Sequence, residues 1–139
     1  MTLEQHFPGL KNTDYAIISP RTPKYNCIAW AVGDTTRFWW PRDEAYWPPT
    51  VPKEATIDAL VQAFETLGYA HCNTADKENG IEKVAIYAKG QEPKHAARQL
   101  KSGMWTSKLG NEEDIVHTLD GLAGEMYGDV VRLLMRQRS

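Results

Sequence analysis

The sequence has few features of secreted, membrane-embedded or nucleic-acid-binding proteins. It contains only two cysteines, Cys27 and Cys72, so a disulfide-stabilised scaffold is not expected. No apolar run approaches the roughly 20 residues that a membrane helix needs. The formal net charge of -2 provides no basic surface for nucleic acid or for an anionic membrane. Residues 1–10 do not have the pattern of a secretory leader, and we therefore expect a cytoplasmic protein.

Tryptophan and proline are abundant instead, with five and eight residues, and many of them lie between residues 34 and 52. So many prolines exclude a helix or a central strand, while the aromatic area is too large to remain in solvent. We expect an ordered loop whose aromatic side chains mostly cover the core. Trp39, Trp40 and Trp47 are also candidates for contact with a substrate, because the loop can form one wall of a cleft.

The chain length and the residue patterns predict one α+β domain that spans residues 1–139. Thr56 is a good N-cap for an amphipathic helix that continues until Gly68. Residues 83–88 form an apolar, β-rich run that is typical of a central strand. We predict further strands at residues 15–18 and 130–135, and a short capped helix or turn that starts at Asn111.

Residues 94–100 and 105–110 are joined around a Ser102-Gly103 turn, and this pattern predicts a β-hairpin. The register of the hairpin decides which residues lie beside His95. With a two-residue turn, His95 lies opposite Gly110. With a three-residue turn, Ser107 shares the face of His95. The sequence leaves both registers open.

A second short helix is predicted at residues 27–32, with Asn26 as its N-cap and Gly33 at its end. Cys27 then lies in the first turn, where free backbone N–H groups and the helix dipole favour a thiolate. The cysteine can therefore be a nucleophile. The alternative is that Cys27 is only a small buried apolar residue.

Cysteine and histidine together form the machinery of thiol catalysis, in which the imidazole takes the thiol proton and the sulfur attacks a carbonyl. His95 is 68 positions from Cys27, so only the fold can bring them together. A third polar group that orients the imidazole is Ser107, Asp114 or His117. The backbone N–H of Cys27 would contribute to an oxyanion site.

The motifs Asn26-Cys27 and His95-Ala96-Ala97 resemble the papain-like fold, in the compact branch of bacterial cell-wall amidases and peptidases that includes the CHAP type. The segments Asn26-Cys27-Ile28-Ala29-Trp30-Ala31 and Trp105-Thr106-Ser107-Lys108-Leu109-Gly110 resemble those of a family of small uncharacterised bacterial proteins. The resemblance implies N-terminal helices packed on a small antiparallel sheet. It also implies hydrolysis or acyl transfer at an amide or thioester, with Cys27, His95 and Ser107 as catalytic residues. Asn26 and the three tryptophans are the candidate substrate-binding residues.

Two other functions fit parts of the sequence. One is a catalytically idle papain-like module that binds a protein partner in a bacterial conflict system through the aromatic loop at residues 38–49. The other is a transition-metal site formed by Cys27, His71, Cys72 and His95. The spacing of these residues is not that of a zinc site, so we expect neither a metal nor another cofactor. The sequence does not specify the substrate or the oligomeric state.

Overall fold

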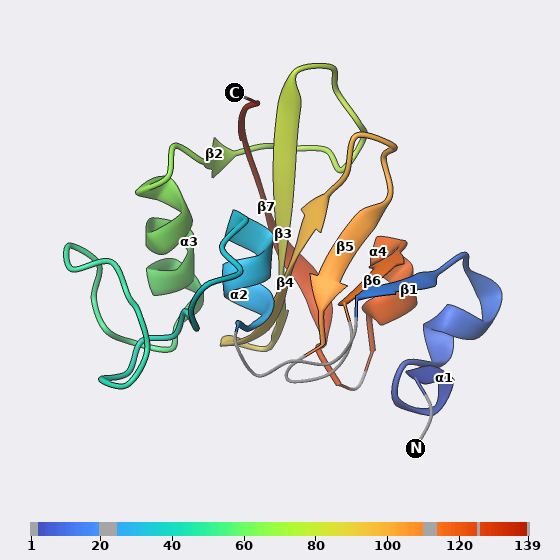
Figure 1. Cartoon of the computed structure of the whole chain (residues 1–139), viewed down its shortest axis with the longest axis horizontal. Coiled ribbons are helices and arrows are strands. Elements are labelled where there is room, and N and C mark those ends of the chain that lie inside the picture. The colour runs from blue at the N-terminus through green and yellow to red at the C-terminus, as the bar shows by residue number, and fades with distance from the viewer. Residues whose placement is uncertain (1–2, 20–24, 110–113, 125, 139) are drawn as a thin grey trace.

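The computed structural model describes residues 3–19, 25–109, 114–124 and 126–138. Within these residues a seven-stranded sheet has the order β1-β6-β5-β4-β3-β7-β2, and every neighbouring pair is antiparallel (Figure 1). The strands are β1 (Ala16–Ser19), β2 (Ala70–His71), β3 (Ile81–Lys89), β4 (Glu92–Gln99), β5 (Trp105–Lys108), β6 (Asp114–His117) and β7 (Asp129–Gln137). The helices are α1 (Leu3–His6), the 3-10 helix η1 (Pro8–Asn12), α2 (Cys27–Val32), α3 (Ile57–Glu65) and α4 (Leu119–Leu122). The predicted α+β class is confirmed.

Two apolar clusters lie on opposite faces of this sheet. The first joins α2, α3 and the aromatic loop to strand residues such as Ile86 and Ala96. The second joins Phe7 and Leu10 to their neighbours on the other face of the strands, such as Tyr87 and Ala97. Figure 1 accordingly shows α2 and α3 on one side of the sheet and α4 on the other. Alternation along β4 therefore directs adjacent side chains into different clusters.

The helix predicted after Thr56 is α3, and its N-cap is confirmed because the Thr56 hydroxyl accepts a hydrogen bond from the Ala59 N–H at 3.1 Å. The predicted central strand is also confirmed, because β3 lies between β4 and β7. The last strand, β7, pairs with both β3 and β2. These elements have strong local patterns that agree with their burial.

The segment after residue 113 differs from the prediction. Residues 114–117 form strand β6 rather than a helix or turn, while the expected cap Asn111 lies outside the described residues. Ile115 pairs with Ile17 of β1 and with Ser107 of β5, so its backbone belongs to two ladders. These pairings outweigh the local helix signal of the acidic residues.

The β-hairpin is confirmed, and its turn has three residues. Gln99 lies opposite Trp105, and the Leu100 N–H donates to the Met104 carbonyl at 2.8 Å. This register places Ser107 on the same face of the sheet as His95.

None of the helices in the described ranges has the length and hydropathy needed to cross a membrane.

Candidate active site

The start of α2 is fixed by the side chain of Asn26. Its Oδ1 accepts hydrogen bonds from the N–H groups of Ala29 and Trp39 at 3.1 and 3.0 Å. Its Nδ2 donates to the Trp39 carbonyl at 2.7 Å. Asn26 is buried and its amide is bonded on both ends, so it positions α2 against the aromatic loop and is not free to bind a substrate as predicted.

Tyr25 connects the same helix start to strands β5 and β6. Its hydroxyl donates to Asp114 Oδ2 at 2.6 Å, and burial, followed by this hydrogen bond, raises the pKa of Tyr25 to about 12. Lys108 lies directly opposite Asp114 in the ladder, with Nζ 3.9 Å from Oδ1 and 5.2 Å from the Tyr25 ring centroid. The side chains of Lys108 and Asp114 are both fully buried. This buried cluster holds the residue two positions before Cys27.

The sulfur of Cys27 lies among backbone N–H groups. The backbone N–H groups of Ala96, Ile28 and Cys27 itself favour the thiolate and lower its pKa, but burial has the larger effect and raises the pKa to about 11. The resting group is therefore a thiol and not the thiolate predicted from the helix start. The residue as a whole is only partly buried, so one side of it reaches solvent.

The thiol lies where strands β4 and β5 are no longer paired. In the described residues their ladder consists of Arg98 with Thr106 and Gln99 with Trp105. The indole of Trp30 donates to the Thr106 hydroxyl at 3.0 Å, which holds α2 against β5. The Ala96 N–H that reaches the sulfur belongs to the peptide bond that joins Ala96 to His95. Cys27 is thus next to the backbone of His95.

The His95 side chain points to the face of the sheet opposite α2. It lies across from Tyr87, and its ring stacks on Tyr127 with centroids 4.1 Å apart and planes 3° from parallel. Only 1% of His95 is exposed, and neither ring nitrogen has a hydrogen-bond partner in the described structure. Burial, with a smaller effect of His117, holds its pKa well below the usual range, so the imidazole is neutral.

Tyr127 connects the two predicted catalytic residues. Its ring covers His95, and electrostatic repulsion from a Cys27 thiolate contributes, after burial, to raising the pKa of the Tyr127 phenol. Tyr127 therefore lies near both residues, but their side chains are on opposite faces of the sheet and no hydrogen bond joins the thiol to the imidazole.

The sequence analysis did not identify Tyr127. The signal that could have done so is the pair of glycines, Gly124 and Gly128, that flank it. Gly124 and Gly128 exchange two backbone hydrogen bonds, at 3.0 and 2.7 Å. A Cβ atom on Gly128 would lie 2.1 Å from the Ala88 carbonyl oxygen, so only glycine fits there. This tight turn holds Tyr127 against the sheet.

Ser107 is not bonded to His95, although it is buried on the same face. It pairs with His117, with 2.7 Å between Ser107 Oγ and His117 Nε2. His117 Nδ1 lies 2.6 Å from the Thr118 carbonyl, which can only accept, so Nδ1 carries the hydrogen and Ser107 donates to Nε2. Asp114 accepts from Tyr25 instead. Within the described residues, none of Ser107, Asp114 and His117 makes the expected hydrogen bond to the His95 ring.

Two of the three candidate tryptophans belong to the core. Trp39 and Trp47 are 4% and 7% exposed, and their indole N–H groups donate to Asp34 and to the Pro52 carbonyl. The prediction that they contact a substrate is therefore wrong, because the loop closes the first cluster with them. Trp40 is half-buried against that cluster and keeps some exposed surface.

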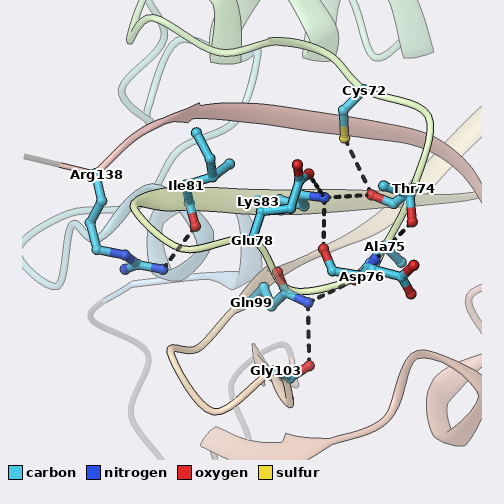
Figure 2. A network of polar contacts seen from close by, with 10 residues as sticks. All are labelled: Cys72, Thr74, Ala75, Asp76, Glu78, Ile81, Lys83, Gln99, Gly103 and Arg138. Atoms are coloured by element: carbon cyan, nitrogen blue, oxygen red, sulfur yellow. Dashed lines mark hydrogen bonds and ion pairs between the residues drawn. The ribbon is translucent and has the colours of Figure 1, made fainter.

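Cys72 belongs to a polar network around Lys83 (Figure 2). The Cys72 thiol donates to the Thr74 carbonyl at 3.6 Å. The buried ammonium of Lys83 donates to the carbonyls of Thr74 and Asp76 and pairs with Glu78, at 2.9, 2.8 and 2.6 Å. No three His, Cys, Asp or Glu side chains converge as metal ligands within the described residues. The Lys83 network instead secures residues 72–78 against the sheet.

An open cavity of about 580 Å³ lies near the residues that cover His95. Its lining includes His6, Pro8 and Met126, which are the chain neighbours of Phe7 and Tyr127. The rings of Phe7 and Tyr127 are 5.0 Å apart. The cavity thus lies beside the Phe7–Tyr127 pair, of which Tyr127 stacks on His95, and neither Cys27 nor His95 is among its lining residues.

Comparisons with known proteins give a family but no activity. A search of curated proteins and a search of solved structures each found no match. Residues 16–135 match the model of the family described as "Domain of unknown function (DUF7689)". Because this match covers the site and most of the chain, the protein belongs to the DUF7689 family.

Proposed function

We propose that this protein is a thiol-dependent hydrolase or acyltransferase with a papain-like arrangement, in which Cys27 attacks an amide or thioester and His95 moves the proton. One observation carries the proposal. The backbone N–H of Ala96, the residue after His95, is among the groups that act on the Cys27 thiol, while the buried His95 ring has two nitrogens without partners. A buried imidazole without hydrogen bonds is costly and is often retained for chemistry.

The protonation states of Cys27 and His95 in the free protein determine the first step of the proposed reaction. The raised pKa of Cys27 and the lowered pKa of His95 mean that both side chains are neutral. The thiol proton must therefore move to an imidazole nitrogen as the sulfur attacks the carbonyl carbon, rather than before. The N–H groups at the start of α2 then donate to the carbonyl oxygen, which becomes negative.

The remaining steps need only water or an acceptor amine or thiol. The tetrahedral adduct collapses, the imidazolium gives its proton to the leaving amine or thiol, and an acyl-thioester remains on Cys27. Water, or an acceptor amine or thiol, then attacks this thioester as His95 removes its proton. Free Cys27 thiol is regenerated in either case.

His95 has to change position during this cycle. Its ring is stacked on Tyr127 and does not bond to the thiol in the resting structure. To accept the thiol proton, a ring nitrogen would have to leave this stack and reach the sulfur from the opposite face of the sheet. Since Ser107 is bonded to His117, packing by Tyr127 and Tyr87 takes the orienting role that we expected of a third polar group.

The test is acylation by an activated ester and an acyl thioester, followed by digestion and mass spectrometry to locate the acyl group. We expect the adduct on Cys27 in the parent and in Cys72→Ala, which removes the second thiol. In Cys27→Ala, the proteolytic peptide that contains position 27 should carry no acyl group. Equal total acylation of the parent and Cys27→Ala would overturn the proposal.

A catalytically idle binding module is the second candidate, and the missing thiol–imidazole hydrogen bond favours it. In that case Cys27 and His95 are packing residues, and a partner binds elsewhere. Trp40 is the tryptophan of the aromatic loop that keeps exposed surface for such a contact. Partner capture that is weakened by Trp40→Ala and unchanged by Cys27→Ala would support this function.

A further inference from the structure

A second open cavity, of about 320 Å³, lies at the end of the sheet where β3 begins and β7 ends. Three segments line it, namely residues 77–81, the hairpin turn at Lys101 and the end of the chain at Arg138. Figure 1 shows these segments together in the upper part of the view. Neither Cys27 nor His95 is among the lining residues, so a ligand in this cavity does not depend on the proposed thiol chemistry.

Cations outnumber carboxylates among the residues that line this cavity. Lys77, Lys101 and Arg138 bring three positive charges, and Glu78 brings one carboxylate. That carboxylate is already paired, at 2.6 Å, with the fully buried ammonium of Lys83. Lys77 and Lys101 are exposed, and neither forms an ion pair within the part of the chain that the structure describes. The cavity is therefore positive although the whole chain has a net charge of -2.

The guanidinium of Arg138 is positioned by the protein and still reaches solvent. It donates to the Ile81 carbonyl at 3.3 Å, as Figure 2 shows, and its Nη1 lies 3.5 Å from a Glu82 carboxylate oxygen. Glu82 also pairs with Arg136, so one carboxylate is shared between two guanidinium groups. Because the Arg138 side chain stays 26% exposed, a solute in the cavity can contact it.

Buried polar side chains hold the walls of the cavity in place (Figure 2). The amide of Gln99, which is 3% exposed, donates to the carbonyls of Ala75 and Gly103 at 2.8 and 3.3 Å. It thus ties the loop before β3 to the hairpin turn, and the Lys83 network fixes the same loop. A Cβ atom on Gly103 would lie 3.7 Å from Lys77 Cβ, so the stem of Lys77 packs against the turn. Charged walls that are fixed in advance lose less entropy when a ligand binds.

We propose that this cavity binds a diphosphate group, with Lys77, Lys101 and Arg138 as donors to its oxygens. A diphosphate has several negative charges on two linked groups, which suits cations that come from three different walls. Ammonium and guanidinium groups are both common donors to phosphate oxygens in proteins. A cavity lined by charges of one sign also concentrates ions of the opposite sign from solution.

The experiment is calorimetric titration of the full chain with inorganic pyrophosphate at constant ionic strength and neutral pH. We expect saturable binding to the parent and to Cys27→Ala. Lys77→Gln and Lys101→Gln should each weaken binding about tenfold, as loss of one hydrogen bond between charged groups does. The double variant should bind more weakly than either. Lys11→Gln, which replaces an exposed lysine of η1, is the matched control and should bind as the parent does.

Two further probes define the ligand. Citrate is also multiply charged but has carboxylates, and it should bind clearly more weakly than pyrophosphate. Titration with ADP separates two sources of the diphosphate: comparable affinity indicates a diphosphate ester, and much weaker affinity indicates free pyrophosphate.

The lysine variants keep the proposal falsifiable, because both side chains are exposed and urea unfolding should show the stability of the parent. No saturable binding of pyrophosphate to the parent would overturn the proposal. Equal binding by the parent, Lys77→Gln and Lys101→Gln would overturn it as well. Equal affinity for citrate and pyrophosphate would mean that the cavity attracts any multiply charged anion and would overturn the assignment to a diphosphate.

Discussion

The imidazole of His95 lies flat against the phenol ring of Tyr127, with 4.1 Å between the ring centroids. The stack closes one side of the imidazole and contributes to a burial that leaves 1% of His95 exposed. Because burial is the main cause of its lowered pKa, Tyr127 helps to keep the proposed catalytic base neutral.

Removing this ring should therefore change the titration of His95. Tyr127→Ala opens the stacked side to water, and we expect the pKa of His95 to rise toward the ordinary histidine value. Tyr127→Phe keeps the stack and should keep the pKa low. Nuclear magnetic resonance of the His95 ring protons as a function of pH measures both. An equally low pKa in Tyr127→Ala would show that the stack does not control His95.

Acid should destabilise the fold through buried histidines. Burial lowers the pKa of His117 from 6.5 to about 4, against the smaller opposing effect of its hydrogen bond to Thr118. Between these values the unfolded chain binds a proton that the folded chain does not, so the free energy of unfolding falls as the pH falls from 6.5 to 4. The expected loss is on the order of 3 kcal/mol.

Urea unfolding at pH 7 and pH 4.5 measures this loss. His117→Gln removes the titrating group and should reduce the difference between the two pH values, although it is less stable at pH 7 because Ser107 loses its partner. His71→Gln is the control, because His71 is exposed. The same pH dependence in all three proteins would contradict the assignment.

The side chain of Asn26 should contribute more than an ordinary N-cap. Asn26→Ala removes acceptors for two N–H groups and a donor to the Trp39 carbonyl, so we expect a loss of about 2 to 3 kcal/mol in the free energy of unfolding. Asn26→Asp keeps the acceptors and loses the donor. It should be intermediate in urea unfolding, and equal stability of the alanine variant and the parent would contradict this role.

Tryptophans of the aromatic loop should differ according to burial. Trp47→Ala empties part of the first cluster and leaves the Pro52 carbonyl without its donor, so it should cost about 3 to 5 kcal/mol. Trp40→Ala removes a half-buried ring and should cost clearly less. Denaturant unfolding compares the two. Similar small losses in both variants would mean that Trp47 is not a core residue.

The sequence predicted the elements whose local signals agree with their burial. Asn26 and Thr56 are N-caps as expected, and the apolar run of residues 83–88 lies in the central strand β3. Strand β6 could not be predicted in the same way. Its acidic start favours a helix locally, and only pairing with β1 and β5, which are distant in sequence, makes it a strand.

The sequence identified candidate residues of the site, but it did not predict their burial or their hydrogen-bond partners. The pattern identified Cys27 and His95, and Tyr127 lies near both of them, while their side chains are on opposite faces of the sheet. Burial decides what the pattern could not, namely a protonated thiol, a neutral imidazole and a Ser107 bonded to His117. Tyr127 comes from the far end of the chain, and its position depends on the backbone pairing of Gly124 with Gly128, where Gly128 lies against the Ala88 carbonyl.

The most direct test of the central claim is the rate of Cys27 acylation at pH 7 in the parent, His95→Gln and His71→Gln. Because the thiol has a raised pKa, it needs a base at neutral pH. We predict that His95→Gln acylates at least about 100-fold more slowly and that its rate rises about tenfold per pH unit, while His71→Gln matches the parent. Equal rates in all three proteins would show that His95 is not the base and would contradict the account.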